Sequence, residues 1–138
     1  MFVVFEGADG VGKTSHADLL ANRLRAWTGG GADSSQERRE VVRLREPTHG
    51  PWGERIRAAA RNGTRPEPWD EVRWFIEDRK EDVAQNIQPA LARGATVILD
   101  RYFYSSAAYQ GARGIEVAEI LRQNRAFAPE PDLCIVLY

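Results

Sequence analysis

One segment near the start of the sequence restricts the fold more than any other. The glycine-rich run from Gly7 to Thr14 fits the pattern G-x-x-x-x-G-K-[ST] at every fixed position. The short apolar run from Phe2 to Phe5 precedes it, and a helical pattern from Lys13 to Trp27 follows it. This order is typical of a phosphate-binding loop, in which backbone N–H groups and a helix N-terminus face an anion. The alternative is a glycine-rich structural turn with a chance Lys-Thr pair.

The loop pattern predicts how a nucleoside triphosphate would be held. Lys13 would reach the β- and γ-phosphates, and the Thr14 hydroxyl could hold Mg²⁺. The chain has 19 basic residues, and Lys13 and Lys80 are its two lysines. A lysine kept at position 13 fits a site that needs a compact ammonium group. We therefore expect ATP contacts from Gly7, Ala8, Asp9, Gly10, Val11, Gly12, Lys13, Thr14 and Ser15.

Apolar runs and helical segments alternate along the rest of the chain. Strands are predicted at 2–5, 41–44, 95–99 and 133–138. Helices are predicted at 13–27, 52–61, 68–92 with a kink at Pro89, 103–111 and 115–127. Strands spaced by helices predict a parallel sheet covered on both faces, an α/β fold of three layers, with ligands beyond the carboxyl ends of the strands. We expect residues 1–138 to form a single domain, with a flexible Gly/Ser-rich loop at 28–40.

Composition excludes several classes of protein. The net charge is −1, so no excess of positive charge points to a nucleic-acid polymer or an anionic membrane. The apolar runs are too short for a signal sequence or a membrane span, and we expect a cytoplasmic protein. The single cysteine, Cys134, excludes an intramolecular disulfide, and its place in an apolar strand predicts that it is buried.

Asp100 and Arg101 directly follow the predicted strand at 95–99. A carboxylate at this strand end could hold Mg²⁺ opposite Thr14, and the arginine could neutralise charge between two phosphorylated ligands. A structural Asp–Arg ion pair is the alternative.

Arg79 lies on the apolar stripe of the predicted helix at 68–92, one turn after Phe75. An arginine in apolar surroundings needs a partner. That partner is either a buried carboxylate or a ligand, in which case Phe75 stacks on a flat ring and Arg79 binds its polar edge. Periodicity leaves both alternatives open.

Together these residues resemble the thymidylate kinase family. The string from Asp100 to Gln110 resembles the signature D-R-[YF]-x-x-S-x-x-A-[YF]-Q, and residues 5–14 are similar to F-E-G-x-D-G-x-G-K-[ST]. The segments 45–47, 53–57 and 75–79 match R-E-P, G-E-x-I-R and F-x-x-x-R. The phosphate loop is shared by many kinases, whereas the string at 100–110 is much more specific.

The resemblance implies a P-loop nucleoside monophosphate kinase that transfers the γ-phosphoryl group of ATP to dTMP, with Mg²⁺. It implies catalytic roles for Lys13, Asp9 and Arg101, and metal contacts from Thr14 and Asp100. Phe75 would stack on thymine, Arg79 would bind the base edge, and Arg101 and Arg57 would bind the dTMP phosphate. Tyr109 would act as a steric filter against a 2′-hydroxyl. The dTMP contacts implied are Asp9, Glu46, Pro47, Arg57, Phe75, Arg79, Arg101, Ser105, Ser106, Tyr109 and Gln110.

The sequence departs from the family pattern in two ways. Positions 10 and 11 are Gly and Val, so the loop lacks an arginine, as in the subgroup that supplies a basic residue from a lid. The lid, fifth strand and last helix of a typical member are absent from this chain. Since loss of such a charge costs on the order of 10³-fold in rate, we expect weak turnover or none from these residues alone.

If the strand order of the family holds, the predicted strand at 133–138 would lie at an open sheet edge, so we expect poor solubility or a homodimer formed through it. Two alternatives to a dTMP kinase stay open: a kinase for another nucleoside or deoxynucleotide, and a non-catalytic nucleotide-binding module.

Overall fold

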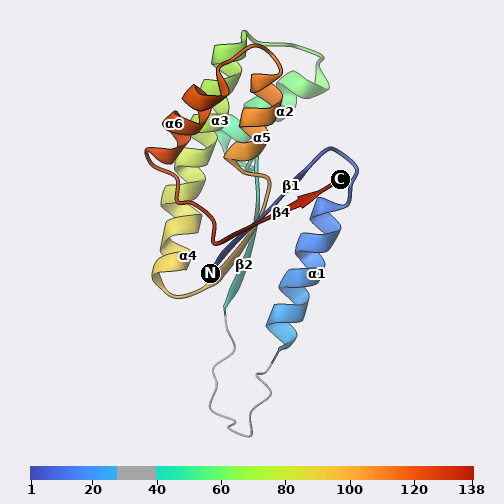
Figure 1. The fold of residues 1–138 in the computed structure, drawn as a ribbon, viewed down its shortest axis with the longest axis vertical. Coiled ribbons are helices and arrows are strands. Elements are labelled where there is room, and N and C mark those ends of the chain that lie inside the picture. Colours follow the sequence, from blue (N-terminus) through green and yellow to red (C-terminus); the bar gives the residue numbers. More distant parts are fainter. Residues whose placement is uncertain (28–39) are drawn as a thin grey trace, which may run out of the picture.

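The computed structural model describes residues 1–27 and 40–138. A parallel sheet lies at its centre (Figure 1). The sheet has four strands in the order β2-β3-β1-β4. The strands are β1 (Phe2–Gly7), β2 (Val41–Arg45), β3 (Thr96–Asp100) and β4 (Leu133–Leu137). The predicted parallel sheet is therefore confirmed. The loop expected at 28–40 lies outside the described residues except for Glu40, whose carbonyl accepts a hydrogen bond from the Thr96 N–H at 2.9 Å.

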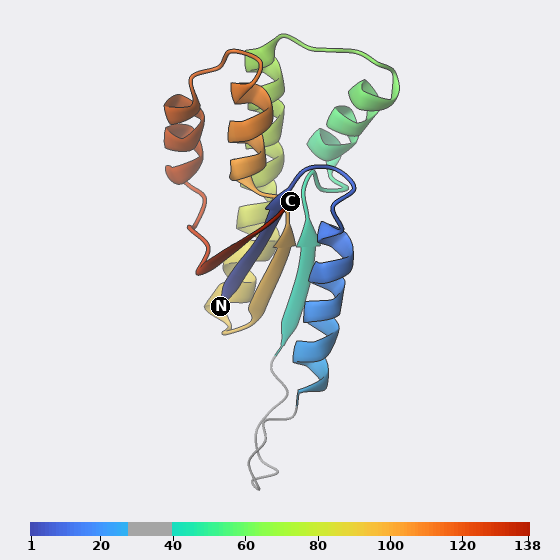
Figure 2. The same cartoon turned by 45° about the vertical axis from the view of Figure 1, so that its right-hand side comes forward.

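Helices cover both faces of the sheet, so the three-layer α/β arrangement is also confirmed. In Figure 2, α1 lies on one face of the sheet and the long helical segment that ends in α4 lies on the other. Within the described residues, no helix is both long and apolar enough to cross a membrane. The helical elements are α1 (Lys13–Ala26), α2 (Pro51–Arg61), α3 (Pro68–Asp82), η1 (Val83–Ile87), α4 (Gln88–Ala92), α5 (Phe103–Gly111) and α6 (Val117–Arg125).

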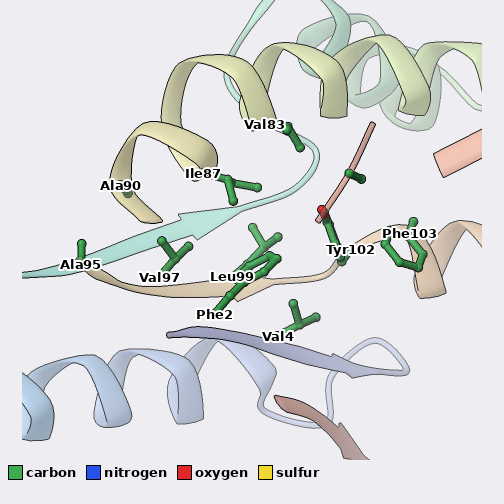
Figure 3. Close-up of a cluster of buried hydrophobic side chains, with 11 residues drawn as sticks. Phe2, Val4, Val83, Ile87, Ala90, Ala95, Val97, Leu99, Tyr102 and Phe103 are labelled. Atoms are coloured by element: carbon green, nitrogen blue, oxygen red, sulfur yellow. The ribbon is translucent and has the colours of Figure 1, made fainter. Parts of the chain in front are cut away.

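The core divides between the two faces because successive strand side chains point to opposite sides. On the face covered by α1, the strand residues Val3, Phe5 and Ile98 pack against Ala17 and Ala21 of that helix. On the other face, β1 and β3 pack against η1, α4 and the start of α5 (Figure 3). The buried side chains of that second cluster are Phe2, Val4, Val83, Ile87, Ala90, Ala95, Val97, Leu99, Tyr102, Phe103 and Ala128.

The helical segment from Pro68 to Ala92 is continuous but contains one π-helical stretch, η1. At its end the Gln88 N–H bonds to the carbonyl of Val83, five residues earlier instead of four. Pro89 follows directly, lacks an N–H, and in a regular α-helix would clash with the carbonyl four residues before it. The wider turn makes room for this ring. The irregularity expected at Pro89 thus lies one turn earlier.

β4 lies at an edge of the sheet and pairs with β1. Cys134 on this strand is exposed, so the prediction that it is buried was wrong. The apolar pattern of the strand is the same as that of a central strand, but its residues are exposed or half-buried, whereas nearly all residues of β1 and β3 are buried. Association of two copies through this edge stays a prediction.

Candidate functional site

The carboxyl ends of the parallel strands meet at one edge of the sheet. Phe5 and Arg45 are both in register with Asp100, and Gly7 is in register with Leu137. The hydrogen-bond ladder continues past β3, because the Arg101 N–H bonds to the Phe5 carbonyl at 2.9 Å. The glycine-rich loop and the Asp100–Arg101 pair therefore lie side by side, as their strand positions predicted.

The glycine-rich loop has a backbone shape that side chains oppose. Gly7 has a φ of 137°, and a Cβ at this position would lie 2.2 Å from the carbonyl oxygen of Leu137. Gly12, with a φ of 88°, is the N-cap of α1. The Lys13 side chain is 6% exposed and its ammonium donates to the carbonyl of Ala8 within the same loop. The loop therefore combines a helix N-terminus with an ammonium group, which suits a phosphate.

Thr14 and Asp100 are in contact below the loop. The Thr14 hydroxyl donates to Asp100 Oδ2 at 2.6 Å, and Arg43 lies 3.5 Å from the same oxygen. Asp100 Oδ1 is buried and has no hydrogen-bond partner. A hydroxyl and a carboxylate with a free oxygen are hard ligands of the kind that Mg²⁺ prefers, so these two residues fit that ion. Among residues 1–27 and 40–138, no group of three or more His, Cys, Asp or Glu is arranged as a metal site.

Arg101 has a backbone conformation that is rare for its residue type. Its φ is 70°, a value that no other non-glycine residue in the described part of the chain approaches. Its guanidinium forms an ion pair with Asp9 at 2.5 Å and a hydrogen bond to Ser105 Oγ at 3.0 Å, and it lies 5.4 Å from the ring centre of Tyr109. This left-handed geometry costs roughly 1–2 kcal/mol. It aims the guanidinium at the glycine-rich loop.

A cavity of about 710 Å³ opens between this edge of the sheet and helices α2, α3 and α5. Ten of the eleven residues expected to contact dTMP line it: Asp9, Glu46, Pro47, Arg57, Phe75, Arg101, Ser105, Ser106, Tyr109 and Gln110. The exception is Arg79. Other lining residues include Arg45, Arg65, Glu71, Trp74 and Arg113.

The cavity lining contains both charged and aromatic side chains. Five arginines line it against three carboxylates, so the lining carries an excess of positive charge. Phe75 and Trp74 supply flat apolar surface from α3. Such a lining suits an anionic ligand that carries a flat ring.

Arg57 is held at the cavity by the loop that follows β2. Its guanidinium donates to the carbonyl of Pro47 at 2.8 Å and to that of Thr48, and it pairs with Glu54 at 2.7 Å. These bonds fix an arginine at the cavity.

Arg79 is buried behind the cavity wall. Its side chain is 1% exposed, and it donates to Glu46 Oε2 at 2.5 and 2.8 Å, to Asn124 Oδ1 at 2.5 Å and to Ser106 Oγ at 3.4 Å. Of the two partners left open by the sequence, the buried carboxylate is therefore present. Direct contact between Arg79 and a ligand stays a prediction.

Burial dominates the electrostatics of this buried network. Removal from water raises the pKa of Glu46, and the charge and hydrogen bonds of Arg79 oppose the rise. Glu46 Oε1 is buried without a hydrogen-bond partner. Burial likewise raises the pKa of Asp82, in the last turn of α3, to about 6.

Sequence reasoning missed two sets of residues near the cavity. Glu71 accepts hydrogen bonds from Arg113 at 2.6 Å and from Gln110 at 3.2 Å and forms part of the wall, but no local pattern joins them. Glu6 is buried and accepts hydrogen bonds from the start of α5. Glu6 belongs to the matched segment at 5–14, but that segment does not show what Glu6 binds, because its hydrogen-bond partners lie about a hundred residues later in the chain.

Comparison with known proteins shows the family of this chain. The sequence matches the family model described as thymidylate kinase over residues 5–138. It is 42% identical over 135 residues to thymidylate kinase of Desulfotalea psychrophila, a match that covers 98% of this chain and 61% of that protein. It is 47% identical over 137 residues to thymidylate kinase of Xanthomonas euvesicatoria, a match that covers 99% of this chain and 55% of that protein.

Comparison of the fold with solved structures also finds a thymidylate kinase. A crystal structure of thymidylate kinase from Ehrlichia chaffeensis superposes with a TM-score of 0.85 at 32% sequence identity, covering 100% of this chain and 71% of that one. The chain spans about three fifths of the length of the curated relatives it matches. The family match covers nearly all of the sequence, including both the glycine-rich loop and the string at 100–110. This chain belongs to the thymidylate kinase family.

Proposed function

We propose that this chain carries the phosphate loop and acceptor cavity of an enzyme that transfers the γ-phosphoryl group of ATP to dTMP, giving dTDP and ADP. One observation carries the proposal: the Asp9–Arg101 ion pair joins the glycine-rich loop to an arginine-lined cavity that also presents Phe75. Donor and acceptor phosphates would therefore meet at Arg101. The proposal places the reaction in the cytoplasm and involves no nucleic-acid polymer.

The donor side is the glycine-rich loop. Its backbone N–H groups and Lys13 would hold the ATP phosphates, since both lie where the N-terminus of α1 adds partial positive charge. Thr14 and Asp100 would hold Mg²⁺, which neutralises charge on the phosphates when it is bound. Asp9 lies at the mouth of the loop, where it keeps Arg101 turned toward the reacting groups.

The acceptor side is the cavity. Arg101 and Arg57 would bind the dTMP phosphate, because a fixed guanidinium matches phosphate oxygens well. Phe75 would stack on thymine, and Ser105, Ser106 and Gln110 would line its pocket together with Glu46 and Pro47. Tyr109 would stand beside the sugar and disfavour a 2′-hydroxyl. Arg79 would support the base edge from behind Ser106 and Glu46.

This set of residues suits phosphoryl transfer because that reaction requires positioning and charge neutralisation more than covalent chemistry. Arg101 is the group that both ligands would share. Its two side-chain partners and its backbone bond to β1 restrict its orientation before any ligand binds. An enzyme gains rate when such groups are already oriented.

Binding and turnover test the proposal separately. Calorimetric titration of the chain should show tighter binding of dTMP than of dCMP or dGMP. ADP release in the presence of ATP, Mg²⁺ and dTMP should require dTMP and should be lost in the Lys13→Ala variant. This variant should still bind dTMP, because Lys13 is absent from the cavity lining. Equal affinity for the three monophosphates would contradict thymine as the acceptor base.

A further inference from the structure

Glu6 lies at the end of β1, immediately before the glycine-rich loop, and is 5% exposed. Its carboxylate is directed at the start of α5. Oε1 accepts hydrogen bonds from the backbone N–H groups of Tyr102 at 2.9 Å and Ser105 at 3.1 Å, and Oε2 accepts one from the Ser105 hydroxyl at 2.5 Å. One side chain therefore binds three donors that lie 96 and 99 residues later in the sequence.

The bonds to the backbone satisfy a need of the helix itself. The N–H groups of a first helical turn have no partner within the helix. Tyr102, the N-cap of α5, has no side-chain cap. Glu6 accepts from the Tyr102 N–H and also from the Ser105 N–H, which is shared with the Tyr102 carbonyl at 3.1 Å. A carboxylate is favourable there because the helix N-terminus carries partial positive charge.

The bond to the Ser105 hydroxyl has a different consequence. That hydroxyl has one hydrogen, which it donates to Glu6, so its lone pairs are free to accept from Arg101 at 3.0 Å. Arg101 is also held to β1 through its own N–H, in the left-handed conformation. Strand β1 thus fixes the backbone of Arg101 directly and its guanidinium through Ser105.

We propose that Glu6 is a positioning residue whose carboxylate orients the Ser105 hydroxyl and thereby holds the Arg101 guanidinium ready for the phosphate of the acceptor nucleotide. This role rests on the proposed function, in which Arg101 binds that phosphate. Glu6 is absent from the cavity lining, so a ligand in the cavity would not touch it. It couples the strand that leads into the glycine-rich loop to the helix that leads away from Arg101.

The variant Glu6→Gln separates the orienting role from the capping role. The amide oxygen can keep both backbone bonds to α5, which directs the amide N–H₂ at Ser105. The Ser105 oxygen then accepts a hydrogen bond from the new amide instead of donating one to the carboxylate, so its own hydrogen loses its acceptor on Glu6 and competes with Arg101 for the remaining directions around the oxygen. We therefore expect a thermal midpoint close to that of the parent chain, with a misdirected guanidinium.

The readout is the affinity for dTMP and for thymidine, which lacks the phosphate. Glu6→Gln should weaken dTMP binding about tenfold, as expected for a lost hydrogen bond to a charged group, and should leave thymidine binding unchanged. Ser105→Ala should show the same selective loss. In an Arg101→Ala background, Glu6→Gln should have no further effect on dTMP binding, because both changes act through one guanidinium. Glu119→Gln, on α6, is the matched control and should alter neither affinity.

The outcomes distinguish the two proposals. If the parent chain binds dTMP no better than thymidine, the proposed function fails, and the role of Glu6 fails with it. If the parent discriminates and Glu6→Gln keeps the full discrimination, the positioning role alone is overturned. An equal loss for dTMP and thymidine, or additive losses in the Arg101→Ala background, would also overturn it, because a merely structural role predicts those results.

Discussion

Asp82 offers the sharpest test of the electrostatics of the interior. Its side chain is 2% exposed, Oδ1 accepts a hydrogen bond from Asn86 at 2.8 Å, and Oδ2 is buried without a partner. Burial raises its pKa from 3.8 to about 6, helped by the nearby charge of Asp78 and opposed by Asn86 and Arg79. The folded state therefore binds this proton more tightly than the unfolded chain does.

The sign and size of the effect follow from the pKa difference. The stability that protonated Asp82 contributes is fully present below pH 3.8 and is lost as the pH rises through about 6. A rise of about two pKa units corresponds to about 3 kcal/mol at 1.36 kcal/mol per unit. Asn does not ionise, so Asp82→Asn does not lose stability in this way as the pH rises. One unpartnered amide N–H lowers the stability of the variant by about 1 kcal/mol at every pH. The variant should therefore be less stable than the parent at pH 4 and more stable at pH 8.

Urea unfolding, followed by tryptophan fluorescence at pH 4, 6 and 8, measures this difference. The free energy of unfolding of Asp82→Asn minus that of the parent should rise by about 2.5 kcal/mol from pH 4 to pH 8, because the unfolded Asp82, with a pKa of 3.8, is already partly ionised at pH 4. Asp70→Asn, at the exposed start of the same helix, is the control and should show a much smaller change. A constant difference for Asp82→Asn, or one that falls as the pH rises, would refute the reasoning.

Three further predictions concern packing and binding. Gly53→Ala would bring a Cβ to 1.8 Å from the Thr48 carbonyl oxygen, so it should lower the free energy of unfolding by at least about 2 kcal/mol. The thermal midpoint should fall, and an unchanged midpoint would contradict the close approach of α2 to that loop. Asn124→Ala removes a hydrogen-bond acceptor from the buried Arg79, so it should lower the free energy of unfolding in urea by about 2 kcal/mol. An unchanged free energy of unfolding would mean that Arg79 finds another partner. Phe75→Ala should weaken dTMP binding about tenfold in calorimetry, since stacking of a base on an aromatic ring is worth about 1–3 kcal/mol, and unchanged affinity would exclude the stacking role.

Local sequence patterns predicted most of the fold. The glycine-rich loop and the apolar run before it placed β1 and α1, because backbone shape and burial there depend on adjacent residues. The helix predicted at 115–127 begins at Val117, since Glu116 acts as its N-cap by accepting from the Ala118 N–H. The exposure of Cys134 could not be predicted, because it depends on β4 being an edge strand.

The candidate site was predicted where its residues belong to short motifs. The string at 100–110 placed Arg101, Ser105, Ser106, Tyr109 and Gln110 together, and all line the cavity. The partner of Arg79 could not be chosen from periodicity, because Glu46 lies 33 residues earlier, directly after β2, and meets α3 only in the folded chain. The role of Glu6 was missed for the same reason, since its partners come from another element.

The buried position of Arg79 has a consequence for how this site can change. One guanidinium ties together the loop after β2 through Glu46, α5 through Ser106 and α6 through Asn124. The residues that shape one wall of the cavity are therefore also residues that hold the fold together. Substitutions aimed at a different base would alter folding and recognition at once. A library built to redirect specificity at this wall should be screened first for folded protein, and changes at Phe75 or Trp74, outside this network, offer the less disruptive starting point.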